Sequence, residues 1–281
     1  MAGRSWILLF VPLLLLSCAA HHGGTGTSGP ALPPSETSAR AALDASPRHG
    51  EMVDVPRTGG TPIRTWVVYP ERSDKAGIVL LVHEIYGLSD WMRGVADALA
   101  AEGFIVVAPD LISGMGPGGG GTDSVPSRDD VVQLVRNLTP EETAARLADV
   151  RAWAQALPAG NAKVASMGFC WGGARSFEFA AAEPAPQGAV VFYGTSPDSA
   201  RLARVRAPVL GHYGGDDERV NATIAPARDR LRALGRSYDV HVYAGAGHGF
   251  LRAQDGRVGA NLRATRAAWP RTIAFLKRQL R

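Results

Sequence analysis

Residues 168–173 have the sequence Gly-Phe-Cys-Trp-Gly-Gly, between an apolar run and a segment that is typical of a helix. This is the pattern G-x-S-x-G of a nucleophile elbow, with cysteine in place of serine. A side chain at Gly168 or Gly172 would clash where the strand and the helix cross at such a turn. The N-terminus of the following helix stabilises a thiolate and then an oxyanion. We therefore expect Cys170 to be a nucleophile and the backbone N–H of Trp171 to be one oxyanion donor.

Segments typical of strands alternate with segments typical of helices from about residue 50 onward. The run at 77–82 is apolar at nearly every position, as expected of a central strand that is buried on both faces. This alternation predicts one α/β domain over 50–281, with a mostly parallel central sheet and helices on both faces. Strands are expected at 65–69, 77–82, 104–108, 164–169, 189–193, 209–213 and 238–243, and helices at about 89–102, 140–157, 173–182, 224–234 and 260–280.

Two polar motifs follow the later strands, in the order in which this kind of sheet places its acid and its base. The acid is expected at Asp217, with the adjacent Asp216 as the alternative, and the base at His248. Like Cys170, these residues fall at the carboxyl ends of strands, where such sheets bind ligands. A Cys-His-Asp set works because the histidine accepts the thiol proton and the carboxylate holds the imidazole tautomer.

Composition limits the partners of the chain. Of its 281 residues 46% are hydrophobic and 20% charged, so a sizeable core can form. The net charge is only +4 and the chain has no block of lysine and arginine, so no nucleic-acid partner is expected.

A Gly-rich loop over 112–127 lacks the Lys-Ser/Thr ending of a phosphate loop and is instead a candidate rim of the active site.

No metal or cofactor is expected. His83 and Glu84 are adjacent in a strand pattern, so their side chains point to opposite faces and chelate poorly. The two histidines at 21–22 lie in a polar stretch and are interpreted as incidental. His212 and His241 lie inside strand patterns, where a structural role is expected.

The N-terminus has the features of an export signal. Arg4 precedes a short apolar core over 6–16, which is too short to span a bilayer. The following Leu-Ser-Cys, ending at Cys18, resembles a bacterial lipobox. We therefore expect residues 1–17 to be a lipoprotein signal peptide and Cys18 to be lipidated, the alternative being an ordinary cleaved signal with an incidental cysteine. Ala19 favours the outer membrane over the inner one, so the chain is expected to be a periplasm-facing lipoprotein of the bacterial cell envelope, attached to the membrane through Cys18.

Residues 18–49 are rich in Gly, Ala, Ser, Thr and Pro, and this composition predicts a flexible tether. If Cys18 carries a lipid, Cys170 is the only other thiol of an exported chain. A lone thiol in an oxidising compartment has no disulfide partner within the chain, which favours a chemical role over an inert buried one.

Four ordered motifs resemble the dienelactone hydrolase family of the α/β-hydrolase fold. They are Gly-Phe-Cys-Trp-Gly-Gly at 168–173, His-Glu-Ile-Tyr-Gly at 83–87, Gly-Gly-Asp-Asp at 214–217 and Gly-His-Gly-Phe at 247–250. The resemblance covers roughly 50–281. It implies a hydrolase of carboxylic esters or lactones that works through a thioester on Cys170.

The resemblance also implies roles for two residues of the second motif. The carboxylate of Glu84 would keep the resting thiol protonated or paired until substrate redirects it. The backbone N–H of Ile85 would join that of Trp171 in the oxyanion hole.

The substrate-binding positions of the family match only in part. Arg252 corresponds to one of two arginines that bind a substrate carboxylate. Tyr193 corresponds to a tyrosine near the pocket, the alternative being that this aromatic residue at the end of a strand serves only in packing. The second arginine is replaced by Ile-Ser-Gly at 112–114, which leaves Arg93 and Arg128 as candidates. Two other functions stay open: a catalytically inactive, envelope-tethered binding protein on the same fold, and a hydrolase of the thioesterase or peptidase type.

Overall fold

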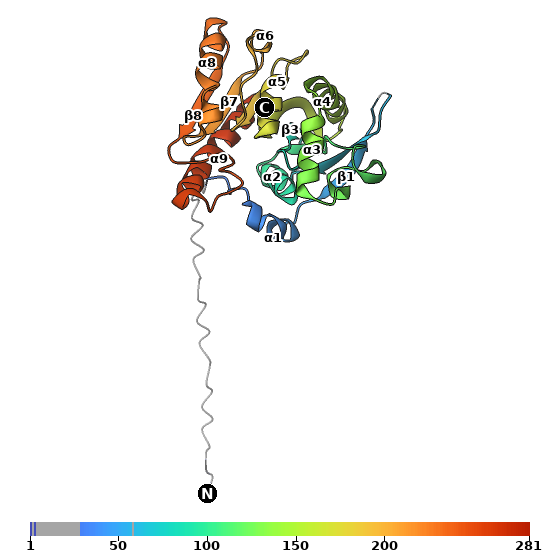
Figure 1. Ribbon diagram of the computed structural model, residues 1–281. Coiled ribbons are helices and arrows are strands. Elements are labelled where there is room, and N and C mark those ends of the chain that lie inside the picture. The colour runs from blue at the N-terminus through green and yellow to red at the C-terminus, as the bar shows by residue number, and fades with distance from the viewer. Residues whose placement is uncertain (2, 4–28, 58) are drawn as a thin grey trace.

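An eight-stranded sheet forms the centre of the chain, with the strand order β1-β2-β4-β3-β5-β6-β7-β8 (Figure 1). The structure is a computed structural model that describes residues 1, 3, 29–57 and 59–281. The first two pairings, β1 with β2 and β2 with β4, are antiparallel, and all the others are parallel. The mostly parallel sheet expected from the sequence is thereby confirmed. The strands are β1 (Gly50–Val55), β2 (Ile63–Val68), β3 (Ala76–Val82), β4 (Ile105–Pro109), β5 (Gly160–Phe169), β6 (Ala189–Phe192), β7 (Val209–Gly214) and β8 (Tyr238–Tyr243).

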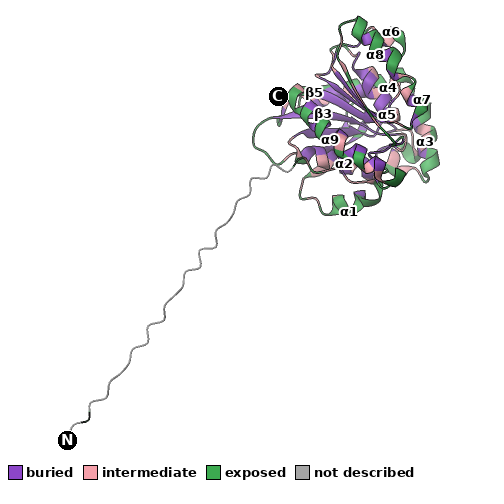
Figure 2. Cartoon of the chain, turned by 90° about the vertical axis from the view of Figure 1, so that its left-hand side faces the viewer, coloured by how far each residue is buried: buried purple, intermediate pink, exposed green. Residues whose placement is uncertain are grey.

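The central strand β3 explains why the sheet needs helices on both faces. All seven of its residues are buried. Val79 and Leu81 belong to one hydrophobic cluster, whereas Ile78 and Leu80 belong to another on the opposite face, as alternation along a strand requires. In Figure 2 the strands at the centre are coloured as buried, while green, exposed residues lie on the outer helices.

Two layers of helices cover these clusters. Side chains of α2 and α9 complete the first cluster, and side chains of α3, α4, α5 and α8 cover the opposite face. The helices are α1 (Ala39–Asp44), α2 (Asp90–Ala101), α3 (Arg128–Asn137), α4 (Pro140–Gln155), α5 (Trp171–Phe179), α6 (Ser199–Leu202), α7 (Glu218–Asn221), α8 (Ile224–Ala233) and α9 (Ala260–Gln279). Short 3₁₀ turns are η1 (Glu36–Ser38), η2 (Pro117–Gly119), η3 (Thr122–Ser124) and η4 (Arg257–Gly259).

Helix α4 begins where the sequence predicts. The Thr139 hydroxyl accepts a hydrogen bond from the backbone N–H of Glu142, and Pro140 occupies the first turn. Both features satisfy a helix N-terminus, because the first N–H groups lack partners within the helix. Helix α5 instead ends at Phe179, three residues before the end expected from the sequence.

The segment expected to be a flexible tether is folded over its C-terminal part, so that prediction is wrong there. Residues 36–44 form η1 and α1, and α1 packs on α2 (Figure 1). Ala39 is buried, and the carbonyl of Pro34 accepts a hydrogen bond from Trp91 Nε1 at 3.0 Å. A few small apolar residues are enough here, because they join the cluster around α2 and do not have to form a core of their own. Cys18 and the expected signal peptide, apart from residues 1 and 3, lie outside the described residues.

Within the described part of the chain, no helix is long and apolar enough to cross a membrane.

Candidate active site

The turn at Cys170 is a strained elbow that depends on glycine. Cys170 has φ 53° and ψ −116°, a conformation that costs free energy for any residue with a side chain. A Cβ atom on Gly168 would lie 2.1 Å from the carbonyl oxygen of Gly172, and one on Gly172 would lie 2.2 Å from that of His83. The steric reason expected for both glycines is thereby confirmed. The elbow presents Cys170 between the end of β5 and the start of α5.

Burial keeps the thiol of Cys170 protonated in this state. Burial, together with the nearby charge of Glu84, raises the pKa of Cys170 to about 11, whereas the N–H of Trp171 acts in the opposite direction. A thiol with this pKa is almost entirely uncharged at neutral pH. The expected nucleophile is therefore in its uncharged form in this state.

Asp217, and not Asp216, contacts the candidate base. Asp217 Oδ2 lies 2.5 Å from His248 Nδ1, and the Asp217 side chain is nearly buried. Asp216 points elsewhere and forms a half-exposed ion pair with Arg257 at 3.1 Å. No hydrogen bond joins His248 to Cys170 among the described side chains. Contacts of this kind commonly tighten only when substrate binds.

Glu84 is a buried carboxyl group that joins several parts of the site. One oxygen lies 2.9 Å from Arg252 Nε, and the other accepts a hydrogen bond from the Tyr193 hydroxyl at 3.4 Å. Burial raises the pKa of Glu84 to about 7, although the charge of Arg252 acts in the opposite direction. Glu84 therefore titrates near neutral pH, beside a thiol whose own pKa depends on the charge of Glu84.

Tyr193 lies beneath this carboxyl group. Its side chain is fully buried, and its ring packs edge-on against His248 with a centroid distance of 5.1 Å. Of the two roles expected for Tyr193, substrate contact or packing, its burial favours packing, because the side chain contacts Glu84 and His248.

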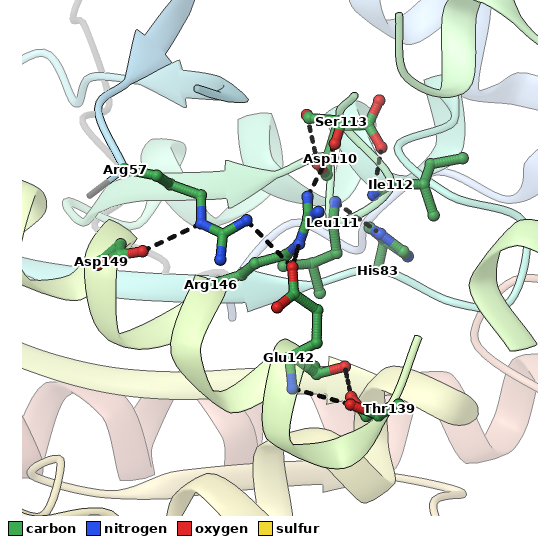
Figure 3. A network of polar contacts seen from close by, with 11 residues as sticks. Arg57, His83, Asp110, Leu111, Ile112, Ser113, Thr139, Glu142, Arg146 and Asp149 are labelled. Atoms are coloured by element: carbon green, nitrogen blue, oxygen red, sulfur yellow. Dashed lines mark hydrogen bonds and ion pairs between the residues drawn. The ribbon is translucent and has the colours of Figure 1, made fainter. Parts of the chain in front are cut away.

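His83 fixes the backbone that leads to Ile85, one of the two expected oxyanion donors. Its Nδ1 donates to the carbonyl of Glu84 at 2.6 Å. Its Nε2 accepts from the N–H of Leu111 at 3.1 Å (Figure 3). Both ring nitrogens are used and burial lowers the pKa of His83, so the ring is neutral and structural. The N–H of Ile85 has no acceptor among the described residues, and Trp171 begins α5, where N–H groups lack partners within the helix. No cluster of three or more metal-binding side chains occurs among the residues that the structure describes.

The loop after β4 cannot present a cation in place of the missing second arginine. The Ser113 hydroxyl donates to the carbonyl of Asp110 at 2.6 Å, and the carbonyl of Ser113 accepts from Arg146 at 2.9 Å (Figure 3). Ile112 is fully buried. These residues anchor the loop, and their side chains are occupied in doing so.

Of the two candidates for the second arginine, the structure brings Arg128 to the site and not Arg93. Arg93 is paired with Asp123 at 2.8 Å. Arg128 lies over the ring of Tyr86, 3.5 Å from the ring centroid, and Arg252 lies 5.2 Å from the same centroid. Both guanidinium groups therefore gather around one tyrosine beside Glu84.

Removing the charge of Glu84 is expected to make Cys170 more reactive towards alkylating agents. The variant Glu84→Gln lacks the negative charge that raises the pKa of Cys170, so this pKa falls and more thiolate is present at a given pH. A fall of one unit increases the thiolate about tenfold below the pKa. The rate of iodoacetamide labelling as a function of pH measures this change, with Asp44→Asn as a control for the loss of one exposed charge. An unchanged profile in Glu84→Gln would contradict the electrostatic link.

A mostly parallel sheet that carries a nucleophile elbow, followed by an acid paired to a histidine after later strands, defines an α/β-fold hydrolase. The dienelactone hydrolase family matches residues 63–280. The chain belongs to this family, and it is an enzyme of the carboxylic ester and lactone hydrolase class. The resemblance found in the four sequence motifs is thereby confirmed.

Individual relatives agree with this assignment. The carboxymethylenebutenolidase of Pseudomonas sp. (strain P51) is 32% identical over 233 residues, which cover 81% of this chain and 95% of that protein. The crystal structure of a Klebsiella pneumoniae protein provisionally named dienelactone hydrolase superposes with a TM-score of 0.71 at 27% identity, covering 82% of this chain and 98% of the other. A dienelactone hydrolase from Anabaena variabilis has the same fold, with a TM-score of 0.62 at 24% identity over 83% of this chain and 99% of that one.

Proposed function

We propose that the protein hydrolyses small carboxylic esters or lactones with Cys170 as nucleophile and a thioester intermediate. The observation that carries the proposal is the 2.5 Å contact between Asp217 and His248. This pair follows the carboxyl ends of β7 and β8, just as Cys170 follows the carboxyl end of β5. The Pseudomonas relative is named for hydrolysis of a butenolide, which is a lactone. Its similarity supports the same substrate class here.

In the first half of the reaction, His248 accepts the thiol proton and the Cys170 sulfur attacks the carbonyl carbon. The carbonyl electron pair moves to oxygen, where the N–H groups of Ile85 and Trp171 stabilise the charge. The C–O bond then breaks, and His248 returns the proton to the leaving oxygen. Asp217 holds the imidazole in place throughout and stabilises its charged form.

In the second half, His248 accepts a proton from water, and the resulting hydroxide attacks the thioester carbon. The C–S bond breaks, the carboxylic acid leaves, and the proton on His248 returns to the sulfur of Cys170. Because the same base acts in both halves, one histidine suffices.

Glu84 controls when the thiol becomes reactive. With Glu84 charged, the pKa of Cys170 stays high although the charge of Arg252 opposes this, and the resting enzyme is protected from alkylation and oxidation. A substrate that rearranges the Glu84–Arg252 pair would remove this restraint.

Trapping the acyl intermediate tests the proposal. The purified protein is mixed rapidly with an activated ester and quenched in acid, and intact-protein and peptide mass spectrometry then locate the acyl group. We expect one acyl group per chain, on the peptide that contains Cys170, and none in Cys170→Ala. Turnover of esters or lactones without an adduct that depends on Cys170 would refute the thioester route. A chain that turns over no ester, lactone, thioester or peptide would instead be the inactive binding protein.

We also propose that the enzyme is anchored in the bacterial cell envelope, facing the periplasm, through a lipid on Cys18. The lipobox-like residues before Cys18 support this, and Ala19 supports the outer membrane. Labelling of expressing cells with a clickable fatty acid, followed by membrane fractionation, provides the test. The label should be lost in Cys18→Ser, whereas a labelled variant or an unlabelled wild type would refute the anchor.

A further inference from the structure

The N-terminal segment places a carboxylate at the arginine side of the active site. The backbone N–H of Glu36 donates to the carbonyl of Arg252 at 2.9 Å, although the two residues are 216 positions apart. The segment is fastened just before this point, because the carbonyl of Pro33 accepts from Gln254 Nε2 at 2.9 Å. Beyond it, Ala39 is buried against the core. The position of Glu36 is thus set by packing and backbone contacts on both sides.

The carboxylate of Glu36 binds both arginines that gather around Tyr86. Its Oε1 lies 2.8 Å from Arg128 Nη2, and its Oε2 pairs with Arg252 Nη1. Two guanidinium groups this close repel each other unless an anion lies between them. Each guanidinium thus holds one oxygen of the same carboxylate through a charge-assisted contact, which is the strong kind of hydrogen bond.

The arginine pair is linked directly to the reactive part of the site. Arg252 contacts Glu36 with Nη1 and Glu84 with Nε, the latter at 2.9 Å, and the charge of Glu84 acts on Cys170. A surface hollow beside the pair is lined by Glu36, Tyr86, Ser127 and Arg128, among others. A ligand that enters here therefore meets Arg128 already bound to Glu36, whose other oxygen pairs with Arg252.

We propose that Glu36 is an internal ligand of the Arg128–Arg252 pair and thereby determines the substrate class of this enzyme. With the pair neutralised, the site accepts uncharged esters and lactones and rejects those that carry a free carboxylate, because a second anion meets the charge of Glu36. This inference rests on the hydrolase function proposed above and specifies its substrate.

The test compares two para-nitrophenyl esters, the uncharged acetate and the monoester of glutaric acid, which carries a free carboxylate. Wild type should show the higher kcat/KM with the acetate. Glu36→Gln keeps the shape of the side chain but frees both arginines, so the ratio of kcat/KM for the glutarate monoester to that for the acetate should rise about tenfold to a hundredfold. Adding Arg128→Ala to Glu36→Gln should remove most of this gain.

Asp44→Asn is the matched control, because Asp44 is an exposed acid of the same segment that pairs with Arg40 and not with Arg128 or Arg252. Its ratio should equal that of wild type. An unchanged ratio in folded Glu36→Gln, or a wild type that prefers the glutarate monoester, would overturn the proposal.

A binding measurement separates this proposal from the proposed function. Calorimetric titration with glutarate should give tighter binding to Cys170→Ala/Glu36→Gln than to Cys170→Ala, and it requires no turnover. If neither ester is hydrolysed, the hydrolase proposal fails and the glutarate affinities alone decide the role of Glu36. Equal affinities would then refute that role.

Discussion

Replacing Cys170 with alanine is expected to lower kcat for an ester or lactone substrate by about 10⁴-fold or more. The variant keeps the elbow, His248 and the two oxyanion donors, but it has no atom that can form the acyl intermediate. Only stabilisation of the oxyanion and substrate binding then remain. Steady-state kinetics on the best substrate of an ester and lactone panel measures the loss.

Two further measurements distinguish loss of the nucleophile from loss of the fold. Thermal unfolding of Cys170→Ala should match that of wild type within a few degrees, because both residues occupy the same strained backbone conformation. Cys170→Ser should also be nearly inactive, because a hydroxyl group is ionised far less readily than a thiol in the same buried turn. A folded Cys170→Ala that retained more than about a tenth of the activity would show that Cys170 is not the nucleophile.

The sequence predicts the centre of this fold well because the centre is built from strongly patterned segments. The run at 77–82 corresponds to β3, and the strand expected at 238–243 coincides with β8. Strand β1 and helix α3 were not predicted as elements. Residues of α3 are mostly charged or exposed and only Val131 and Val135 are buried, so its apolar periodicity is short. Strand β1 lies at the sheet edge, where burial is partial and the pattern is correspondingly weak.

The site, too, could be predicted where it depends on strongly patterned strands and could not be predicted where it depends on a weakly patterned segment. Cys170, Asp217 and His248 come at the carboxyl ends of strands, so the fold determines their approximate meeting point. The contact of Glu36 with Arg128 and Arg252 depends on how a polar segment packs, and the separation along the chain gives no hint of it. The average composition of residues 18–49 gave no sign that residues 36–44 are folded. A few apolar residues among many small polar ones are enough to pack on an existing core. The capping sequence of Ser, Glu, Thr and Ser at 35–38 is the signal that could have indicated local order.

The structural role of the histidines also shows what a sequence pattern leaves open. His212 looks like a candidate base by residue type alone. In the fold its two ring nitrogens contact the Tyr243 hydroxyl at 2.9 Å and the Thr272 hydroxyl at 3.0 Å, and burial lowers its pKa well below the ordinary value. A buried, neutral ring with both nitrogens hydrogen-bonded cannot accept a proton from Cys170, so His248 stays the expected base.

The variant Asp217→Asn is expected to lower kcat by about 10³- to 10⁴-fold, whereas Asp216→Asn should change it less than about twofold. Both substitutions remove one negative charge from the same turn after β7. Only Asp217 contacts His248, and an amide there offers an N–H where the imidazole Nδ1–H needs an acceptor, so the wrong tautomer is favoured. Asp216 pairs with Arg257 at the surface, and an exposed pair contributes little.

Steady-state kinetics of the two variants, together with ¹⁵N NMR of the histidine ring, would decide between these residues. In wild type the proton of neutral His248 should be on Nδ1, and in Asp217→Asn it should move towards Nε2. If Asp216→Asn proved the more damaging variant, the contact seen at Asp217 would not be the one used in catalysis. If both variants kept full activity, His248 would need no carboxylate partner, and the role expected for Asp217 would be wrong.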